Sequence, residues 1–90
     1  MTYIYLIGTE VKQKIGFSKN IQKRLKQLQT GSPEKLTLHH YIEVPDDFVK
    51  KLEKIIHHEL SYKRLHGEWF DMDIAFGKNF LTYMEIHYIN

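Results

Sequence analysis

Two short runs of strand-forming residues stand at the start of the chain. Residues 3–8 are almost all aromatic or branched aliphatic, and residues 12–17 alternate polar with apolar side chains. This composition and alternation predict two antiparallel strands joined by a tight turn. If residues 9–10 form the turn, Tyr5 faces Lys14 across the hairpin.

The next segment has helical periodicity. Apolar residues recur at i, i+4 and i+7 from residue 21, which predicts a helix over residues 21–29. Ser18 or Asn20 can cap its first turn, and Thr30 with Gly31 can end it. The apolar stripe consists of Ile21, Leu25 and Leu28.

The basic residues of this helix are not equivalent. At 100° per residue, Arg24 falls beside Leu28 at the edge of the apolar stripe. Lys19, Lys23 and Lys26 point to the opposite face. Arg24 is therefore the basic side chain expected to look inward.

The remainder of the chain alternates again between strand and helix patterns. A strand is predicted over residues 35–44, and a longer helix from Pro45 to about Tyr62. Residues 67–72 favour a short strand or an extended turn, and Asp73 can cap a final helix. The whole pattern predicts one α+β (α/β) domain over residues 1–90 without linkers or repeats.

Composition narrows the class of protein. Apolar residues make up 42% and charged residues 27%, as in ordinary globular domains. We expect no membrane association, since no segment suits a bilayer span or an export leader, and we expect a cytoplasmic protein. The absence of cysteine excludes disulfides, thiolate zinc sites and thiol catalysis. A bound metal would then take carboxylate, histidine or water ligands, which favours a hard cation.

Charge is unevenly distributed along the chain. Residues 1–40 contain seven Lys or Arg against Glu10 and Glu34 only, whereas the rest is net acidic. A basic half of this kind is typical of domains that contact phosphates, although such a run also occurs as an ordinary solvated face.

Three residues, Tyr5, Glu53 and Glu59, are candidates for chemistry on the residues alone. A lysine ammonium beside Tyr5 would favour the phenolate form, although ordinary cross-strand packing explains the same pair. On the long helix, Glu53 and Glu59 both lie near the apolar face, and helical phase does not choose between them. Solvated carboxylates paired with neighbouring lysines are the alternative for both. Zinc is not favoured, because the His58-Glu59 pair lacks the second histidine of the metalloprotease motif.

Five groups of residues, in this order and spacing, resemble the motifs of the GIY-YIG nuclease superfamily. The resemblance is to its small phage- and virus-associated branch related to an open reading frame of phage T5. It covers the chain from Tyr3 to the last helix. The groups are Tyr3-Ile4-Tyr5, Lys14-Ile15-Gly16-Phe17-Ser18-Lys19-Asn20, Arg24-Leu25 with Gln29-Thr30-Gly31-Ser32-Pro33, Glu53 with His57, and Gly67-Glu68-Trp69-Phe70.

The resemblance implies a three-stranded antiparallel sheet flanked by helices, and cleavage of DNA phosphodiester bonds with Mg²⁺ (or Mn²⁺). Tyr5 matches the tyrosine that acts as, or hydrogen-bonds to, the general base. Lys14 stands at the position of a second tyrosine, and Arg24 matches the arginine that contacts the scissile phosphate. Glu53 matches the metal-binding glutamate, which selects it over Glu59.

Further positions follow from the same resemblance. Ser18 and Asn20 match residues that line the phosphate path, where Lys19, Lys23 and Lys26 supply charge, and His57 is a supporting residue beside Glu53. Three departures from the family pattern are Tyr3 for a glycine, Lys14 for a tyrosine and Leu28 for a histidine. The general base is therefore Tyr5 or a histidine such as His57.

The resulting expectation is a stand-alone, metal-dependent DNA endonuclease with low or structure-dependent specificity. It would act as a homodimer or with a partner protein, in the host cytoplasm if it is phage-encoded. The alternative is a weakly active or inactive module of the same fold that binds nucleic acid or a partner protein.

Overall fold

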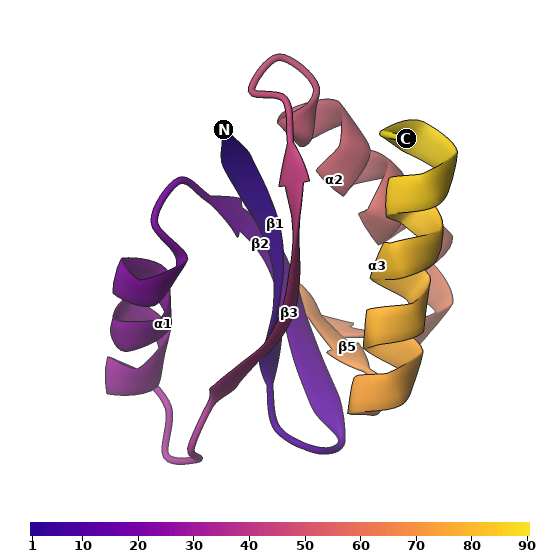
Figure 1. Cartoon of the computed structure of the whole chain (residues 1–90). Helices are drawn as coiled ribbons and strands as arrows, with labels where there is room; N and C mark the ends of the chain where they lie inside the picture. Colours follow the sequence, from indigo (N-terminus) through magenta and orange to yellow (C-terminus); the bar gives the residue numbers. More distant parts are fainter.

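A computed structural model describes all residues, 1–90. It is an α+β fold in which five antiparallel strands form one sheet, in the order β3-β1-β2-β5-β4 (Figure 1). None of its helices has the length and apolarity that a bilayer crossing requires. The elements are β1 (Thr2–Gly8), β2 (Lys12–Ser18), α1 (Ile21–Thr30), β3 (Thr37–Val44), α2 (Val49–Glu59), the 3₁₀ helix η1 (Ser61–Lys63), β4 (Arg64–His66), β5 (Trp69–Asp71) and α3 (Ile74–Tyr88).

The sheet is larger than the three strands expected. β4 and β5 form a short hairpin that extends the sheet beyond β2. Each has three residues, and all three residues of β4 are exposed, so the pair carries no apolar alternation that predicts strands. The only local signal is Gly67, the first residue of the two-residue turn, whose φ of 54° favours glycine.

The register of the first hairpin also differs from the prediction. Tyr5 lies opposite Gly16, and Lys14 lies opposite Ile7. The turn is longer than two residues: the Thr9 backbone N–H donates to the Lys12 carbonyl at 3.0 Å, and the Thr9 hydroxyl accepts from the backbone N–H of Lys12 at 3.3 Å. Because the register moves by two residues, Tyr5 and Lys14 stay on the same face of the sheet.

The two faces of the sheet are covered differently. Figure 1 shows α1 on one side of the sheet and α2 and α3 on the other. On β1, an inner strand of the sheet, Ile4 and Leu6 belong to the larger core under α2 and α3, whereas Tyr5 and Ile7 belong to the smaller core under α1. The alternation along β1 thus puts the candidate tyrosine on the same side as the basic helix.

The helices match the predicted segments, with one change of length. Asn20 caps α1 by accepting from the Lys23 backbone N–H at 3.1 Å, and Asp73 caps α3 by accepting from that of Phe76 at 2.8 Å. Helix α2 begins at Val49, later than predicted, because a turn precedes it in which the Phe48 backbone N–H donates to the Pro45 carbonyl.

Candidate functional site

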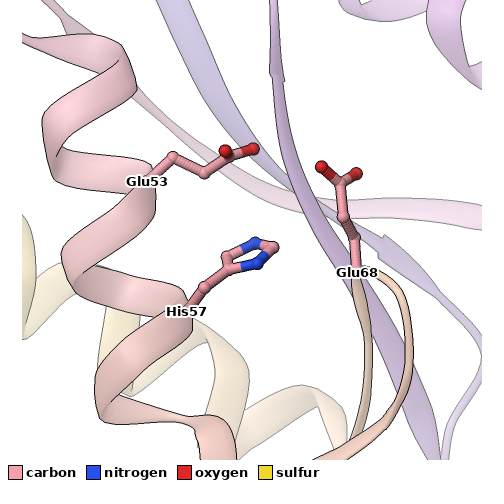
Figure 2. A group of neighbouring side chains, drawn as sticks. All are labelled: Glu53, His57 and Glu68. Carbon is pink, nitrogen blue, oxygen red and sulfur yellow. The ribbon is translucent and has the colours of Figure 1, made fainter.

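Three potential metal ligands converge at the free end of the β4–β5 hairpin. Glu53 and His57 lie one turn apart on α2, and Glu68 lies in the turn between β4 and β5 (Figure 2). One ligand atom from each side chain lies within 4.8 Å of the others, and all three residues are partly buried. Residues from two distant parts of the chain thus form one cluster of two carboxylates and an imidazole.

The backbone of Ile15 holds both sides of this cluster. Strand β5 pairs with β2 only from Lys12 to Lys14, so the sheet ladder ends just before Ile15. The Ile15 N–H donates to the Glu68 carbonyl at 3.1 Å, and the Ile15 carbonyl accepts from His57 Nε2 at 2.8 Å. The site is therefore built where the pairing of β2 with β5 ends and the backbone of β2 bonds to Glu68 and His57.

The hydrogen bond to Ile15 also sets the state of the His57 ring. A carbonyl oxygen only accepts, so Nε2 carries the proton and, in the neutral ring, Nδ1 keeps its lone pair. The ring packs edge-on against Phe70, with centroids 5.0 Å apart. His57 is thus oriented by the fold, with Nδ1 as the nitrogen that remains for a metal or a proton.

Burial and a neighbouring carboxylate disfavour the charged form of Glu53. Burial raises the pKa of Glu53 from 4.5 to about 7, and the charge of Glu68 and a hydrogen bond with it add to this effect. Lys14 opposes it, because its Nζ lies 3.4 Å from Glu68 Oε1. A cation bound between the carboxylates would remove the same repulsion.

The raised pKa of Glu53 predicts that stability depends on pH. Because the folded state raises the Glu53 pKa, the metal-free protein should lose stability as pH rises from about 4.5 to about 7. Glu53→Gln cannot ionise, so its free energy of unfolding should exceed that of the wild type at pH 8 by about 1 kcal/mol, since the carboxylate keeps some solvent contact. Urea unfolding with EDTA at pH 5 and pH 8 measures this. The exposed Glu59→Gln is the control, and equal gains for both variants would contradict the assignment.

Tyr5 and Arg24 form the second part of the site. Arg24 Nε donates to the Tyr5 hydroxyl at 3.3 Å, which confirms that Arg24 looks inward. Burial raises the pKa of Tyr5 above its ordinary value of 10, although the hydrogen bond and charge of Arg24 oppose this. The expectation that Lys14 favours the phenolate is therefore wrong: Tyr5 stays a neutral phenol, and Lys14 is paired with Glu68.

Gly16 lets the two parts of the site approach each other. A Cβ atom at this position would lie 2.5 Å from the Tyr5 hydroxyl and 3.0 Å from Glu68 Oε1. Arg24 is also within electrostatic range of Glu68. The phenol, the guanidinium and the acidic cluster thus belong to one continuous site over Gly16.

Gly16→Ala is expected to lower the free energy of unfolding by about 1–3 kcal/mol, because a buried tyrosine must move to make room for the methyl group. Chemical denaturation measures the loss. Gly31→Ala is the matched control, because the nearest atom to its added Cβ is 3.9 Å away and Gly31 has an ordinary φ of −91°. Equal stability of the two variants would contradict the packing described over Gly16.

The residues expected to act on the phosphate separate into two groups. The first group converges on one site and consists of Tyr5, Lys14, Arg24 and Glu53. Glu59, the rival of Glu53 on α2, is exposed and is not part of the cluster. The other group precedes α1 or lies on its exposed face, and none of its members belongs to the cluster. Its members are Ser18, Lys19, Asn20, Lys23 and Lys26.

The side chains that precede α1 serve local structure. The Ser18 hydroxyl accepts from the Asn20 backbone N–H at 3.0 Å, and Asn20 is the helix cap. Lys19 Nζ lies 3.4 Å from Asp46 Oδ2 at the surface. Lys23 and Lys26 are exposed on α1 and form no ion pair, so their charge is not compensated by a neighbouring carboxylate.

Glu68 is the site residue that sequence reasoning did not assign. The Gly67-Glu68 pair is itself a signal in the sequence, because glycine at the first position favours a two-residue hairpin turn such as the one between β4 and β5. The spatial meeting with Glu53 has no sequence signal, because 14 residues and a 3₁₀ turn separate them.

Comparison with known proteins identifies one relationship. No match was found among curated proteins or among solved structures. The model of one family, described as the T5orf172 domain, matches residues 2–85 and so includes every side chain of the site. The match spans nearly all of β1 through α3. The chain therefore belongs to the T5orf172 domain family.

Proposed function

We propose that this protein is a metal-dependent DNA endonuclease of the GIY-YIG type. The observation that carries the proposal is the meeting of Glu53, His57 and Glu68 beside the hydrogen-bonded pair of Arg24 and the buried Tyr5. Phosphodiester hydrolysis requires stabilisation of negative charge on the phosphate and an activated water. The site brings together groups suited to both tasks.

The donor set fits a divalent cation. Two carboxylates and a neutral imidazole suit Mn²⁺, and the carboxylates with water suit Mg²⁺. Glu53, His57 and Glu68 would hold the ion, and its charge would offset both the burial of the Glu53 carboxylate and its repulsion by Glu68, which together raise the Glu53 pKa. When bound, such an ion polarises a phosphoryl oxygen and lowers the pKa of a water molecule.

Arg24 would bind the scissile phosphate. Its Nε donates to the Tyr5 hydroxyl at 3.3 Å and its Nη1 donates to Gln27 Oε1 at 3.5 Å, which leaves Nη2 and the second N–H of Nη1 for phosphate oxygens. Tyr5 is completely buried and neutral, so it orients Arg24, and its own proton remains to donate toward the acidic cluster. Lys14 keeps a positive charge beside Glu68 and can turn to a phosphate oxygen when substrate enters.

Plasmid nicking tests the proposal. Purified protein should convert supercoiled plasmid to the open circular form with Mg²⁺ or Mn²⁺, and EDTA should stop the reaction. Assays at several salt concentrations separate catalysis from binding, since phosphate contacts weaken steeply with salt. A plasmid that stays intact with both ions while the protein binds it would reject catalysis.

One observation favours the non-catalytic alternative. The Lys14–Glu68 ion pair already supplies a positive charge to the cluster without a metal. A module that uses its basic half only to bind DNA would show salt-sensitive binding without cleavage. It would also show no Mn²⁺ binding that depends on Glu53, which isothermal titration calorimetry measures directly.

A further inference from the structure

An open hollow adjoins the candidate site on the side of α1. It has a volume of about 380 Å³ and lies between β2, the end of α1 and the β4–β5 hairpin. This volume is within the range of about 300–1,000 Å³ that small-ligand sites occupy. Its lining includes Lys12, Gln27, His66 and Trp69 together with the turn of residues 31–34.

The hollow is continuous with the candidate site through two side chains. Lys14 Nζ lies 3.4 Å from Glu68 Oε1 and 5.7 Å from the centre of the Trp69 ring. On the opposite wall, Arg24 Nη1 donates to Gln27 Oε1 at 3.5 Å. A DNA strand whose phosphate is held by Arg24 would therefore place a neighbouring nucleotide at the mouth of the hollow.

The lining suits a flat, uncharged ring. Trp69 is partly exposed and supplies an aromatic wall, with Lys12 Nζ 5.7 Å from its centre. The charge of Lys12 is compensated by Glu34, whose carboxylate lies 2.8 Å from it, so the hollow offers little net charge to a phosphate. The Gln27 amide and the His66 imidazole add donors and acceptors of the kind that read the edge of a base.

We propose that this hollow binds an unpaired nucleobase adjacent to the scissile phosphate, which makes single-stranded or branched DNA the substrate class. The inference rests on the proposed function. A base within a duplex is covered on both faces by its neighbours, so only a base that leaves the stack can lie against Trp69. Continuous duplex would bind by its phosphates alone.

Trp69 itself reports on the hollow, because it is the only tryptophan in the chain. An eight-nucleotide thymidine strand, a blunt duplex of equal phosphate number and free thymidine monophosphate are titrated in EDTA, and tryptophan fluorescence is followed. The strand should quench fluorescence with an affinity about 10-fold or more above that of the duplex, as expected for base–aromatic stacking. Quenching by the free nucleotide at equal concentration would overturn the proposal, since the hollow would then be a nucleotide site.

Variants separate stacking from general binding to DNA. With a fluorescein-labelled strand, Trp69→Leu should weaken single-strand binding by about 10-fold, as expected for lost stacking, and Gln27→Ala should weaken it to a smaller extent. Both variants should weaken single-strand binding more than duplex binding, although Gln27 also contacts Arg24. Gln22→Ala, an exposed glutamine of α1 outside the hollow, is the matched control for Gln27. Circular dichroism verifies that Trp69→Leu is folded. If Trp69→Leu unfolds, Gln27→Ala still tests the hollow.

The outcomes do not depend on catalysis. Because the titrations are carried out in EDTA, a protein that never cuts DNA still tests the hollow. Equal quenching by strand and duplex, or strand binding by fluorescence anisotropy without quenching, would overturn the inference and leave the proposed endonuclease activity intact.

Discussion

Glu53→Gln is expected to reduce Mg²⁺-dependent nicking of supercoiled plasmid by about 1,000-fold or more. The amide preserves the size of the side chain but removes a charged ligand from the Glu53, His57 and Glu68 cluster. A divalent ion contributes several kcal/mol to stabilising a phosphoryl-transfer transition state, and each 1.36 kcal/mol is a factor of ten in rate. The measurement is the initial rate of nicking under single-turnover conditions.

The matched control for this variant lies on the same helix. Glu59→Gln also removes a carboxylate from α2, but Glu59 is exposed and outside the cluster, so its nicking rate should equal that of the wild type. Calorimetric titration with Mn²⁺ should show weaker binding to Glu53→Gln than to the wild type, and unchanged binding to Glu59→Gln. A Glu53→Gln protein that nicks at the wild-type rate would refute the assigned metal site.

Arg24→Lys should lower the nicking rate by about 100-fold at saturating DNA, although the positive charge is retained. A lysine has no planar fork to contact two phosphate oxygens, and it cannot reproduce the bond from Arg24 Nε to the Tyr5 hydroxyl. The substitution should therefore lower mainly the rate at which bound DNA is cut, and it should weaken DNA binding only slightly.

Lys26→Ala provides the contrast. Lys26 is exposed on the same helix, away from Tyr5, so its removal should weaken DNA binding and reduce the salt dependence without changing the rate at saturation. Gel shifts and single-turnover rates distinguish the two variants. If Arg24→Lys and Lys26→Ala behaved alike, Arg24 would be an ordinary member of the basic surface.

Local signals along the chain were sufficient for most of the fold. The strand patterns of residues 3–8 and 12–17 and the apolar stripes of the helices predicted the elements that the structure contains. Asn20 and Asp73 were correct as helix caps, because a side-chain oxygen before a helix has one near partner, the free backbone N–H three residues later. The inward position of Arg24 followed from helical phase, which depends on residues of the same helix.

Long-range pairing decided the rest. The exposed residues of β4 have no pattern of their own, so only pairing along β2 makes the sheet five-stranded. The register of the first hairpin depended on the Thr9 turn, and it placed Gly16 instead of Lys14 opposite Tyr5. These features depend on backbone hydrogen bonds between segments, which leave little trace in the composition of either segment.

The candidate site shows the same division. The sequence by itself determined that Arg24 looks inward from its helix, and the resemblance singled out Tyr5 and Glu53; which side of the sheet the helix covers came from the structure. Only the tertiary structure brought Glu68 to Glu53 and His57, through the two backbone groups of Ile15 at the end of a sheet ladder. The physical reason is that a side chain's helical or strand phase is set by its neighbours in the chain, whereas the meeting of distant side chains is set by where strands pair and where that pairing stops.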